Sequence, residues 1–142
     1  MKLIVHRRNM LSDLIATPTK YGIEVDIRSY GDKLVIHHEP FIKGESFEDW
    51  LAAYQHGMLI LNVKEEGLEA RLIELMRMHG ITDYFFLDQS FPFLVKWSKA
   101  GERRCAVRVS GVGAPPGKRK RNALSLTIVK RSAVRSNNTC FQ

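Results

Sequence analysis

The sequence predicts an α/β fold with a largely parallel sheet. Short β-branched runs bounded by turns or charges alternate along the chain with segments of helical periodicity, which is typical of strands joined by helices. The chain has 142 residues, of which 44% are hydrophobic, so it can bury one core. Its composition does not resemble that of a collagen, a coiled coil or a disordered acidic segment. We therefore expect one globular domain with a tail.

Six segments have the composition of strands, because they are short, apolar and rich in β-branched or aromatic residues. These segments are Leu3–Val5, Ile23–Ile27, Leu34–Ile36, Met58–Val63, Tyr84–Leu87 and Ala106–Val109. The second and third are separated by a short stretch that contains Tyr30-Gly31-Asp32, whereas a parallel crossover takes about a dozen residues. These two should form an antiparallel hairpin, and the other strands should be parallel and joined by helices.

Two segments between the strands have helical patterns. Ser46-Phe47-Glu48-Asp49 is a capping box that should open the first helix, and His56-Gly57 should end it. The second helix is expected over Glu65–His79. Apolar residues recur at helical spacing in both: Phe47, Trp50, Leu51 and Tyr54 in the first, and Leu68, Leu72, Leu75 and Met76 in the second.

Positive charge is concentrated in the C-terminal tail. Residues 1–110 carry 15 Lys/Arg and 15 Asp/Glu, whereas residues 111–142 carry seven Lys/Arg and no acid, so the net charge of +7 belongs to the tail. The Gly- and Pro-containing sequence after Ser110 does not continue the strand–helix pattern. We interpret residues 1–110 as the globular domain and residues 111–142 as a disordered or non-native extension, such as a frameshift would produce.

The cysteines do not indicate zinc or redox chemistry, and the apolar segments do not indicate a membrane protein. Cys105 and Cys140 are too few for a disulfide framework and lack the spacing of a zinc site. Cys105 lies in an apolar alternation, which favours a buried structural thiol. The N-terminal apolar run is too short for a secretory signal or a membrane span. We therefore expect a cytoplasmic protein without an integral membrane segment.

Two acidic residues occupy alternate positions on a predicted strand. Glu24 and Asp26 should project from the same face, so both carboxylates could share a hard divalent cation such as Mg²⁺ or Ca²⁺. The apolar residues between and around them favour this interpretation. The alternative is a solvated face on which the carboxylates pair with Lys or Arg.

Histidines and basic residues follow the ends of neighbouring strands. His6 follows the first strand at its carboxyl end, the edge at which α/β sheets and barrels place their sites. His38 follows the return strand of the hairpin, which brings it back toward the two carboxylates. Imidazoles there could act as general base and general acid, and Arg7 and Lys64 could contact phosphoryl oxygens. Alternatively, each of these residues is part of an ordinary solvated surface.

Taken together, these residues resemble the glycerophosphodiester phosphodiesterase family. That family has, in order, an HRG start, an ExD strand, a KDG-like turn, a VxxHD segment and an ExK strand. The matching segments here are His6-Arg7, Ile23–Arg28, Gly31-Asp32-Lys33, His37–Pro40, Asn62-Val63-Lys64 and Asp88–Phe91. The similarity covers roughly residues 1–110.

The resemblance implies a (β/α) TIM barrel with a β-hairpin excursion after its second strand. A barrel of eight strands takes about 250 residues, and only about five of the eight strands can be found before the tail begins. We therefore expect an incomplete barrel. Its uncovered sheet edge and apolar helix faces would favour self-association.

The resemblance also implies the chemistry. His6 and His38 would be the catalytic acid/base pair, and Arg7 and Lys64 would bind the substrate phosphate. The substrate would be a small-molecule or lipid-derived phosphodiester, hydrolysed to a phosphomonoester and an alcohol. The chain, if active, would be a phosphoric diester hydrolase.

The implied cofactor is a divalent cation, Mg²⁺ or Ca²⁺, held by Glu24, Asp26 and Asn62. The chain departs from the family pattern at this site, because Asn62 stands where the family has a metal-binding glutamate. An amide oxygen can ligate these cations but carries no negative charge, so cation affinity should fall. Two further departures are Arg8 in place of glycine and Glu39 in place of aspartate.

Three hypotheses from different classes remain open. The first is a metal-dependent phosphodiesterase of this family. The second is a non-catalytic phosphate- or nucleic-acid-binding protein that uses the basic tail, although no aromatic residue is interleaved with Lys118–Arg121 for base stacking. The third is an inactive, truncated family member.

Overall fold

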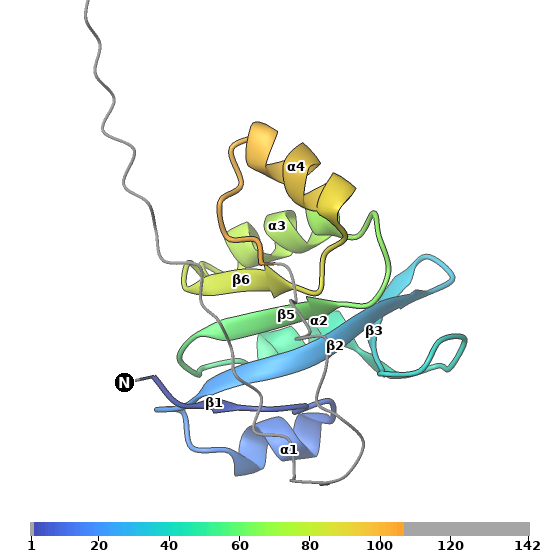
Figure 1. Ribbon diagram of the computed structural model, residues 1–142. Coiled ribbons are helices and arrows are strands. Elements are labelled where there is room, and N and C mark those ends of the chain that lie inside the picture. The colour runs from blue at the N-terminus through green and yellow to red at the C-terminus, as the bar shows by residue number, and fades with distance from the viewer. Residues whose placement is uncertain (1, 107–142) are drawn as a thin grey trace, which may run out of the picture. The chain divides into compact units, whose positions relative to one another are not determined.

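A mixed sheet forms the centre of the structure. The computed structural model describes residues 2–106, and the sheet in this part of the chain has six strands (Figure 1). They are β1 (Ile4–Val5), β2 (Gly22–Tyr30), β3 (Lys33–Ile36), β4 (Glu45–Ser46), β5 (Leu59–Val63) and β6 (Tyr84–Leu87). The path is β4-β3-β2-β5-β6, and β1 also pairs with β2.

Four of the strands are parallel and follow one another in sequential order. β1 pairs with β2, β2 with β5, and β5 with β6, each time in parallel. An isolated parallel bridge then joins Phe86 of β6 to Cys105. Each new parallel strand is therefore added beside the previous one, as the strand–helix alternation predicted.

β2 and β3 form the expected antiparallel hairpin. Their register pairs Ile27 with Ile36 and Tyr30 with Lys33, which leaves Gly31 and Asp32 as the loop. Gly31 has a φ of +64°, a conformation that two-residue hairpin loops require and that glycine adopts without steric cost. β5 occupies one edge of β2 from Ile23 to Ile27, so β1 and β3 share the opposite edge.

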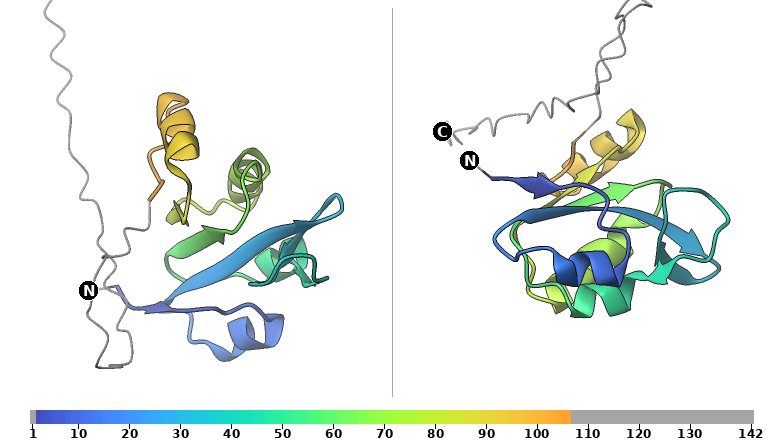
Figure 2. Two further views of the ribbon diagram at one scale, coloured as in Figure 1. Left: turned by 45° about the vertical axis from the view of Figure 1, so that its right-hand side comes forward. Right: turned by 90° about the horizontal axis from the view of Figure 1, so that it is seen from below.

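The described part of the chain also has four helices. They are α1 (Leu11–Ala16), α2 (Phe47–Ala52), α3 (Glu69–Met78) and α4 (Phe91–Lys99). Figure 2 shows α1, α2 and α3 on the same side of the sheet. Leu14 of α1, Trp50 of α2 and Leu72 of α3 belong to one hydrophobic core with Val25 of β2 and Leu61 of β5. The first three helices therefore cover one face of the parallel strands.

Helix boundaries differ from the prediction in two places. The first predicted helix ends at Ala52, before His56-Gly57, and the second begins at Glu69 instead of Glu65. Gly67 has a φ of +99°, which no right-handed helix accommodates, and its amide donates to the Glu69 carboxylate. The start of α2 is as expected, because the Ser46 side chain accepts a hydrogen bond from the amide of Asp49.

Three elements were not predicted: α1, α4 and β4. α1 has six residues and β4 has two, too few for a clear periodicity. α4 begins at Phe91-Pro92, and none of its residues is buried. Ala106, the first residue of the last predicted strand, donates its amide to the carbonyl of Phe86, and the rest of that strand lies outside the described residues.

The coarse fold prediction is confirmed, because the described part is a mixed α/β structure with a mostly open sheet. No helix between residues 2 and 106 has the length and apolar character needed to cross a membrane. The predicted tail, residues 111–142, lies outside the described residues.

Candidate functional site

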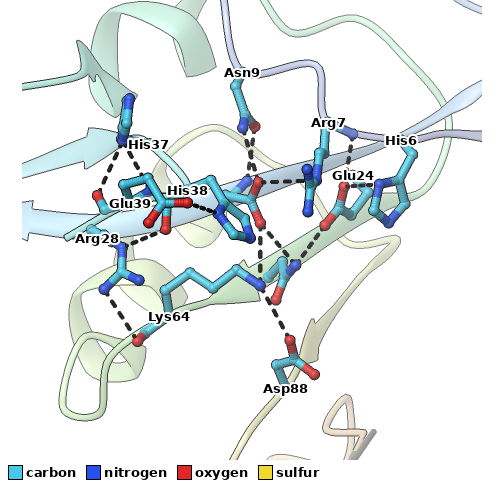
Figure 3. A network of polar contacts seen from close by, with 12 residues as sticks. His6, Arg7, Asn9, Glu24, Arg28, His37, His38, Glu39, Lys64 and Asp88 are labelled. Atoms are coloured by element: carbon cyan, nitrogen blue, oxygen red, sulfur yellow. Dashed lines mark hydrogen bonds and ion pairs between the residues drawn. The ribbon is translucent and has the colours of Figure 1, made fainter. Parts of the chain in front are cut away.

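The predicted site residues lie at and beside the carboxyl ends of the parallel strands. His6 follows β1, Lys64 follows β5 and Asp88 follows β6, whereas Glu24 and Asp26 lie within β2. Figure 3 shows His6, Glu24, Lys64 and Asp88 in one network of polar contacts. Asp26 joins this network through its ion pair with Lys64. The edge at which they gather is the one at which α/β proteins place their sites.

Strand alternation explains why the two carboxylates point away from the hydrophobic core. Ile23, Val25 and Ile27 of β2 belong to the core, so Glu24 and Asp26 between them face the opposite side of the sheet. Both acids are nevertheless buried, with 1% and 0% of their surface exposed. Burial of a carboxylate is costly unless hydrogen-bond donors or opposite charges compensate it, and this site supplies both.

Both oxygens of the Glu24 carboxylate accept hydrogen bonds, and one of them also lies close to an imidazole. Oε1 accepts from Nδ2 of Asn62 at 2.7 Å. Oε2 accepts from the backbone amide of Arg7 at 2.7 Å and lies 3.3 Å from Nδ1 of His6. Glu24, which lies on β2, thus contacts the segment after β1 on one side and Asn62 of β5 on the other.

Asp26 has an even denser set of donors. Oδ1 accepts from Nδ2 of Asn62 at 2.9 Å and lies 3.3 Å from Nζ of Lys64. Oδ2 accepts from Nδ2 of Asn9 at 2.9 Å and lies 3.9 Å from Nε of Arg7. Asn9 makes a second hydrogen bond to the same residue, because its Oδ1 accepts from the backbone amide of Asp26 at 3.0 Å.

Lys64 links the carboxylates of two strands. Its ammonium lies 3.3 Å from Asp26 Oδ1 and 3.2 Å from Asp88 Oδ2, and only 13% of its side chain is exposed. A cation so little exposed is weakly screened by solvent. Its positive charge is shared between these two carboxylates.

The segment after β1 is held in an unusual backbone conformation. Arg7 has a φ of +53°, a left-handed conformation that is uncommon for residues other than glycine. The next residue, Arg8, donates its amide to the carbonyl of Glu24 and accepts from the indole nitrogen of Trp50, both at 3.0 Å. Such strain is frequent at functional sites, where surrounding contacts enforce it.

His38 lies on the other side of the network from His6, as Figure 3 shows. Its Nδ1 is 2.7 Å from Oε1 of Glu39, and its carbonyl accepts from Nε of Arg28 at 2.9 Å. The hydrogen bond to His38 lowers the pKa of the Glu39 carboxyl group below its usual value. Within residues 2–106, no hydrogen bond or ion pair joins the His38 side chain to Glu24 or to Lys64.

The structure therefore brings together six of the seven predicted site residues in direct contact: His6, Arg7, Glu24, Asp26, Asn62 and Lys64. His38 is connected to them through Arg28, whose guanidinium donates to the carbonyls of His38 and Lys64. The catalytic and ligand-binding roles of these residues remain predictions.

The network also includes residues that were not among the predicted site residues, and two of them contact Asp26 or Lys64 directly: Asn9 and Asp88. Asn9 is close to His6 and Arg7 in the sequence, but a polar residue in a loop gives no sign of the strand it will contact. Asp88 follows directly after a predicted strand, and this position was a usable signal.

The donors around the two carboxylates do not fit the divalent cation that the resemblance implies. Asn62 turns Nδ2 toward both acids, whereas its Oδ1 is buried and has no hydrogen-bond partner among residues 2–106. Among residues 2–106, no three or more His, Cys, Asp and Glu side chains form a group that could hold a metal ion. Both oxygens of each carboxylate already face protein donors.

Comparison of the chain with protein-family models, with curated proteins and with solved structures gave no match. The functional interpretation therefore rests on the residues themselves and on their geometry.

Proposed function

We propose that the protein is a phosphoric diester hydrolase of the glycerophosphodiester phosphodiesterase type. The observation that carries this proposal is the convergence of an imidazole, two buried carboxylates and a shielded ammonium at one sheet edge. These groups are His6, Glu24, Asp26 and Lys64. Phosphodiester cleavage needs groups that exchange protons and fixed positive charge for the phosphoryl oxygens, and this site offers both.

The proposal includes a (β/α) barrel-type architecture. In a doubly wound sheet the strand order reverses and helices cover both faces, whereas in a barrel each strand is added beside the last and helices cover the outside. The order β1, β2, β5, β6 and the packing of α1, α2 and α3 on one face support the barrel type. The face that carries Glu24 and Asp26 would then be the interior.

His6 and His38 would move the protons. Each has a carboxylate near Nδ1: Glu24 Oε2 lies 3.3 Å from His6, and Glu39 Oε1 lies 2.7 Å from His38. A carboxylate in this position favours the proton on Nδ1 and leaves Nε2 to exchange a proton with a substrate. Both imidazoles are about two-fifths exposed, so a ligand can reach them.

In the proposed reaction, water or a neighbouring hydroxyl of the substrate attacks phosphorus. Attack by water gives the phosphomonoester directly, whereas attack by the hydroxyl gives a cyclic phosphate, whose ring water then opens to the phosphomonoester. The new P–O bond forms as the bond to the leaving alcohol breaks. One imidazole accepts the proton of the nucleophile, and the other, protonated beforehand, donates a proton to the leaving oxygen. Lys64 and Arg7 stabilise the negative charge that accumulates on the phosphoryl oxygens.

Turnover of phosphodiesters by the full chain tests this function. Bis(4-nitrophenyl) phosphate and glycerophosphodiesters are the substrates, and release of nitrophenol or phosphomonoester is the readout. His6→Ala and His38→Ala should each lower turnover by about 10²- to 10⁴-fold. His79→Ala is the control, because His79 is an exposed residue at the end of α3. Turnover by both site variants at the rate of the wild-type chain would reject the catalytic assignment.

Binding measurements made beside the turnover assay separate the competing hypotheses. Binding of phosphate or phosphodiester without turnover would favour a non-catalytic phosphate-binding protein. Binding of nucleic acid that weakens steeply with salt and disappears when residues 111–142 are deleted would favour the role of the basic tail.

A further inference from the structure

At the centre of the site, the side chain of Asn62 contacts both buried carboxylates, and Lys64 contacts one of them. We propose that the side-chain amide of Asn62, with the ammonium of Lys64, takes the place of a divalent cation between Glu24 and Asp26, so that the site operates without Mg²⁺ or Ca²⁺. The part of this inference that concerns the reaction rests on the proposed function, whereas the part that concerns cation binding does not.

Asn62 occupies the position that a bridging cation would need. A single atom, Nδ2, lies 2.7 Å from Glu24 Oε1 and 2.9 Å from Asp26 Oδ1. These are hydrogen-bond distances, and both protons of the amide group are used. A cation that bridged the same two oxygens would lie between them, so the amide and the cation exclude one another.

The orientation of the amide follows from the charges beside it. If the side chain were rotated by half a turn with no cation present, Oδ1 would face two carboxylate oxygens, and three acceptors would repel one another. In the observed orientation Oδ1 is instead left buried and without a partner among residues 2–106. An unpaired buried acceptor is costly, so the two carboxylates must favour the NH₂ group strongly enough to outweigh that cost.

The remaining oxygens are also satisfied by the protein. Glu24 Oε2 accepts from the Arg7 backbone amide, and Asp26 Oδ2 accepts from Asn9. A cation would have to displace these donors as well as Asn62 to obtain further ligands from the two acids.

Formal charge leads to the same conclusion. The two carboxylates carry two negative charges, and Lys64 and Arg7 lie 3.3 Å and 3.9 Å from Asp26 with two positive charges. A divalent cation in this position would add two positive charges beside the Lys64 ammonium, and like charges at such distances repel. Lys64 and Arg7 therefore already supply positive charge beside the two buried acids, and Lys64 shares its charge with Asp88 at 3.2 Å.

The test compares cation binding by the full chain and by Asn62→Asp. This substitution keeps the size of the side chain and places a third carboxylate between Glu24 and Asp26. Mg²⁺ and Ca²⁺ are titrated by calorimetry and by thermal melting, without substrate. The wild-type chain should bind neither cation stoichiometrically, and its melting temperature should stay constant. Asn62→Asp should bind Ca²⁺ at least about tenfold more tightly and melt several degrees higher when it is present.

Gln55→Glu is the matched control, because it adds the same negative charge at an exposed position after α2. It should not acquire cation binding. If Asn62→Asp fails to fold alone, folding on addition of Ca²⁺ supports the inference, and the wild-type titration remains decisive.

The inference is overturned by stoichiometric Mg²⁺ or Ca²⁺ binding to the wild-type chain, or by turnover that a chelator abolishes and the cation restores. It is also overturned if folded Asn62→Asp gains no cation affinity. By contrast, a wild-type chain that binds no cation and cleaves no phosphodiester would refute the proposed function and leave the role of Asn62 intact.

Discussion

The imidazole of His6 contacts the carboxylate of Glu24, with Nδ1 3.3 Å from Oε2. The two groups differ greatly in exposure, because 43% of the His6 side chain but only 1% of the Glu24 side chain is accessible. The histidine can therefore meet a ligand while the buried acid fixes its orientation. A change in Glu24 should consequently affect both activity and stability.

Glu24→Gln is expected to lower turnover and the free energy of unfolding together. The new NH₂ group would face either the NH₂ of Asn62 or the amide of Arg7, both of which are donors. The loss of such a buried acceptor should cost about 2–4 kcal/mol. Urea unfolding followed by tryptophan fluorescence measures it. Glu66→Gln, at an exposed position, should change stability by less than about 0.5 kcal/mol.

The sequence was sufficient to predict which side chains of β2 share a face. Alternation over Ile23–Ile27 placed three aliphatic residues toward the core and two acids on the other side, and the structure has this arrangement. The hairpin was also predictable, because the stretch around Gly31 is too short for any parallel connection. The first feature follows from the two-residue period of a strand, and the second from the length of the connection between the two strands.

Contacts between distant segments were not predictable in the same way. The indole of Trp50 donates to the carbonyl of Arg8, 42 positions away, and Asn9 contacts Asp26, 17 positions away. Such pairs depend on the paths of the connecting loops, which have no periodic pattern. The orientation of the Asn62 amide depends on two carboxylates of another strand, so no local pattern in the sequence could indicate it.

Trp50→Phe should destabilise the segment around Arg8, which follows His6 in the sequence. Phenylalanine keeps an aromatic ring in the core but removes the N–H group that donates to Arg8 at 3.0 Å. With the smaller ring volume included, we expect a loss of about 2–3 kcal/mol in the free energy of unfolding. Turnover at a temperature at which the variant remains folded should fall as well.

Trp97→Phe provides the matched comparison. The indole nitrogen of Trp97 is buried but has no hydrogen-bond partner among residues 2–106. Its removal should therefore cost much less than the same change at Trp50. Equal losses in chemical denaturation would mean that the contact between Trp50 and Arg8 contributes nothing specific.

Lys64→Met tests the positive charge at the site. Methionine keeps an unbranched side chain, one atom shorter than that of lysine, but cannot attract a phosphoryl oxygen, so turnover should fall by about 10²- to 10³-fold. Inhibition by inorganic phosphate should weaken in parallel, and Lys64→Arg should restore part of it because the charge returns. Lys99→Met, at the exposed end of α4, is the control. Unchanged phosphate inhibition in Lys64→Met would remove the lysine from the proposed anion site.

Cys105 should be an unreactive thiol at neutral pH. Burial, with a smaller effect from the nearby acids Glu102 and Glu69, raises the pKa of its thiol to about 11. Only the thiolate is a good nucleophile, so in a Cys140→Ser variant alkylation by iodoacetamide at pH 8 should be about a hundredfold slower than for free cysteine. The rate should rise about tenfold per pH unit until the pH nears that pKa. In urea the difference should vanish, because the raised pKa comes from burial of the thiol beside β6. If the folded chain reacts as fast as the unfolded one, this burial does not shield the sulfur.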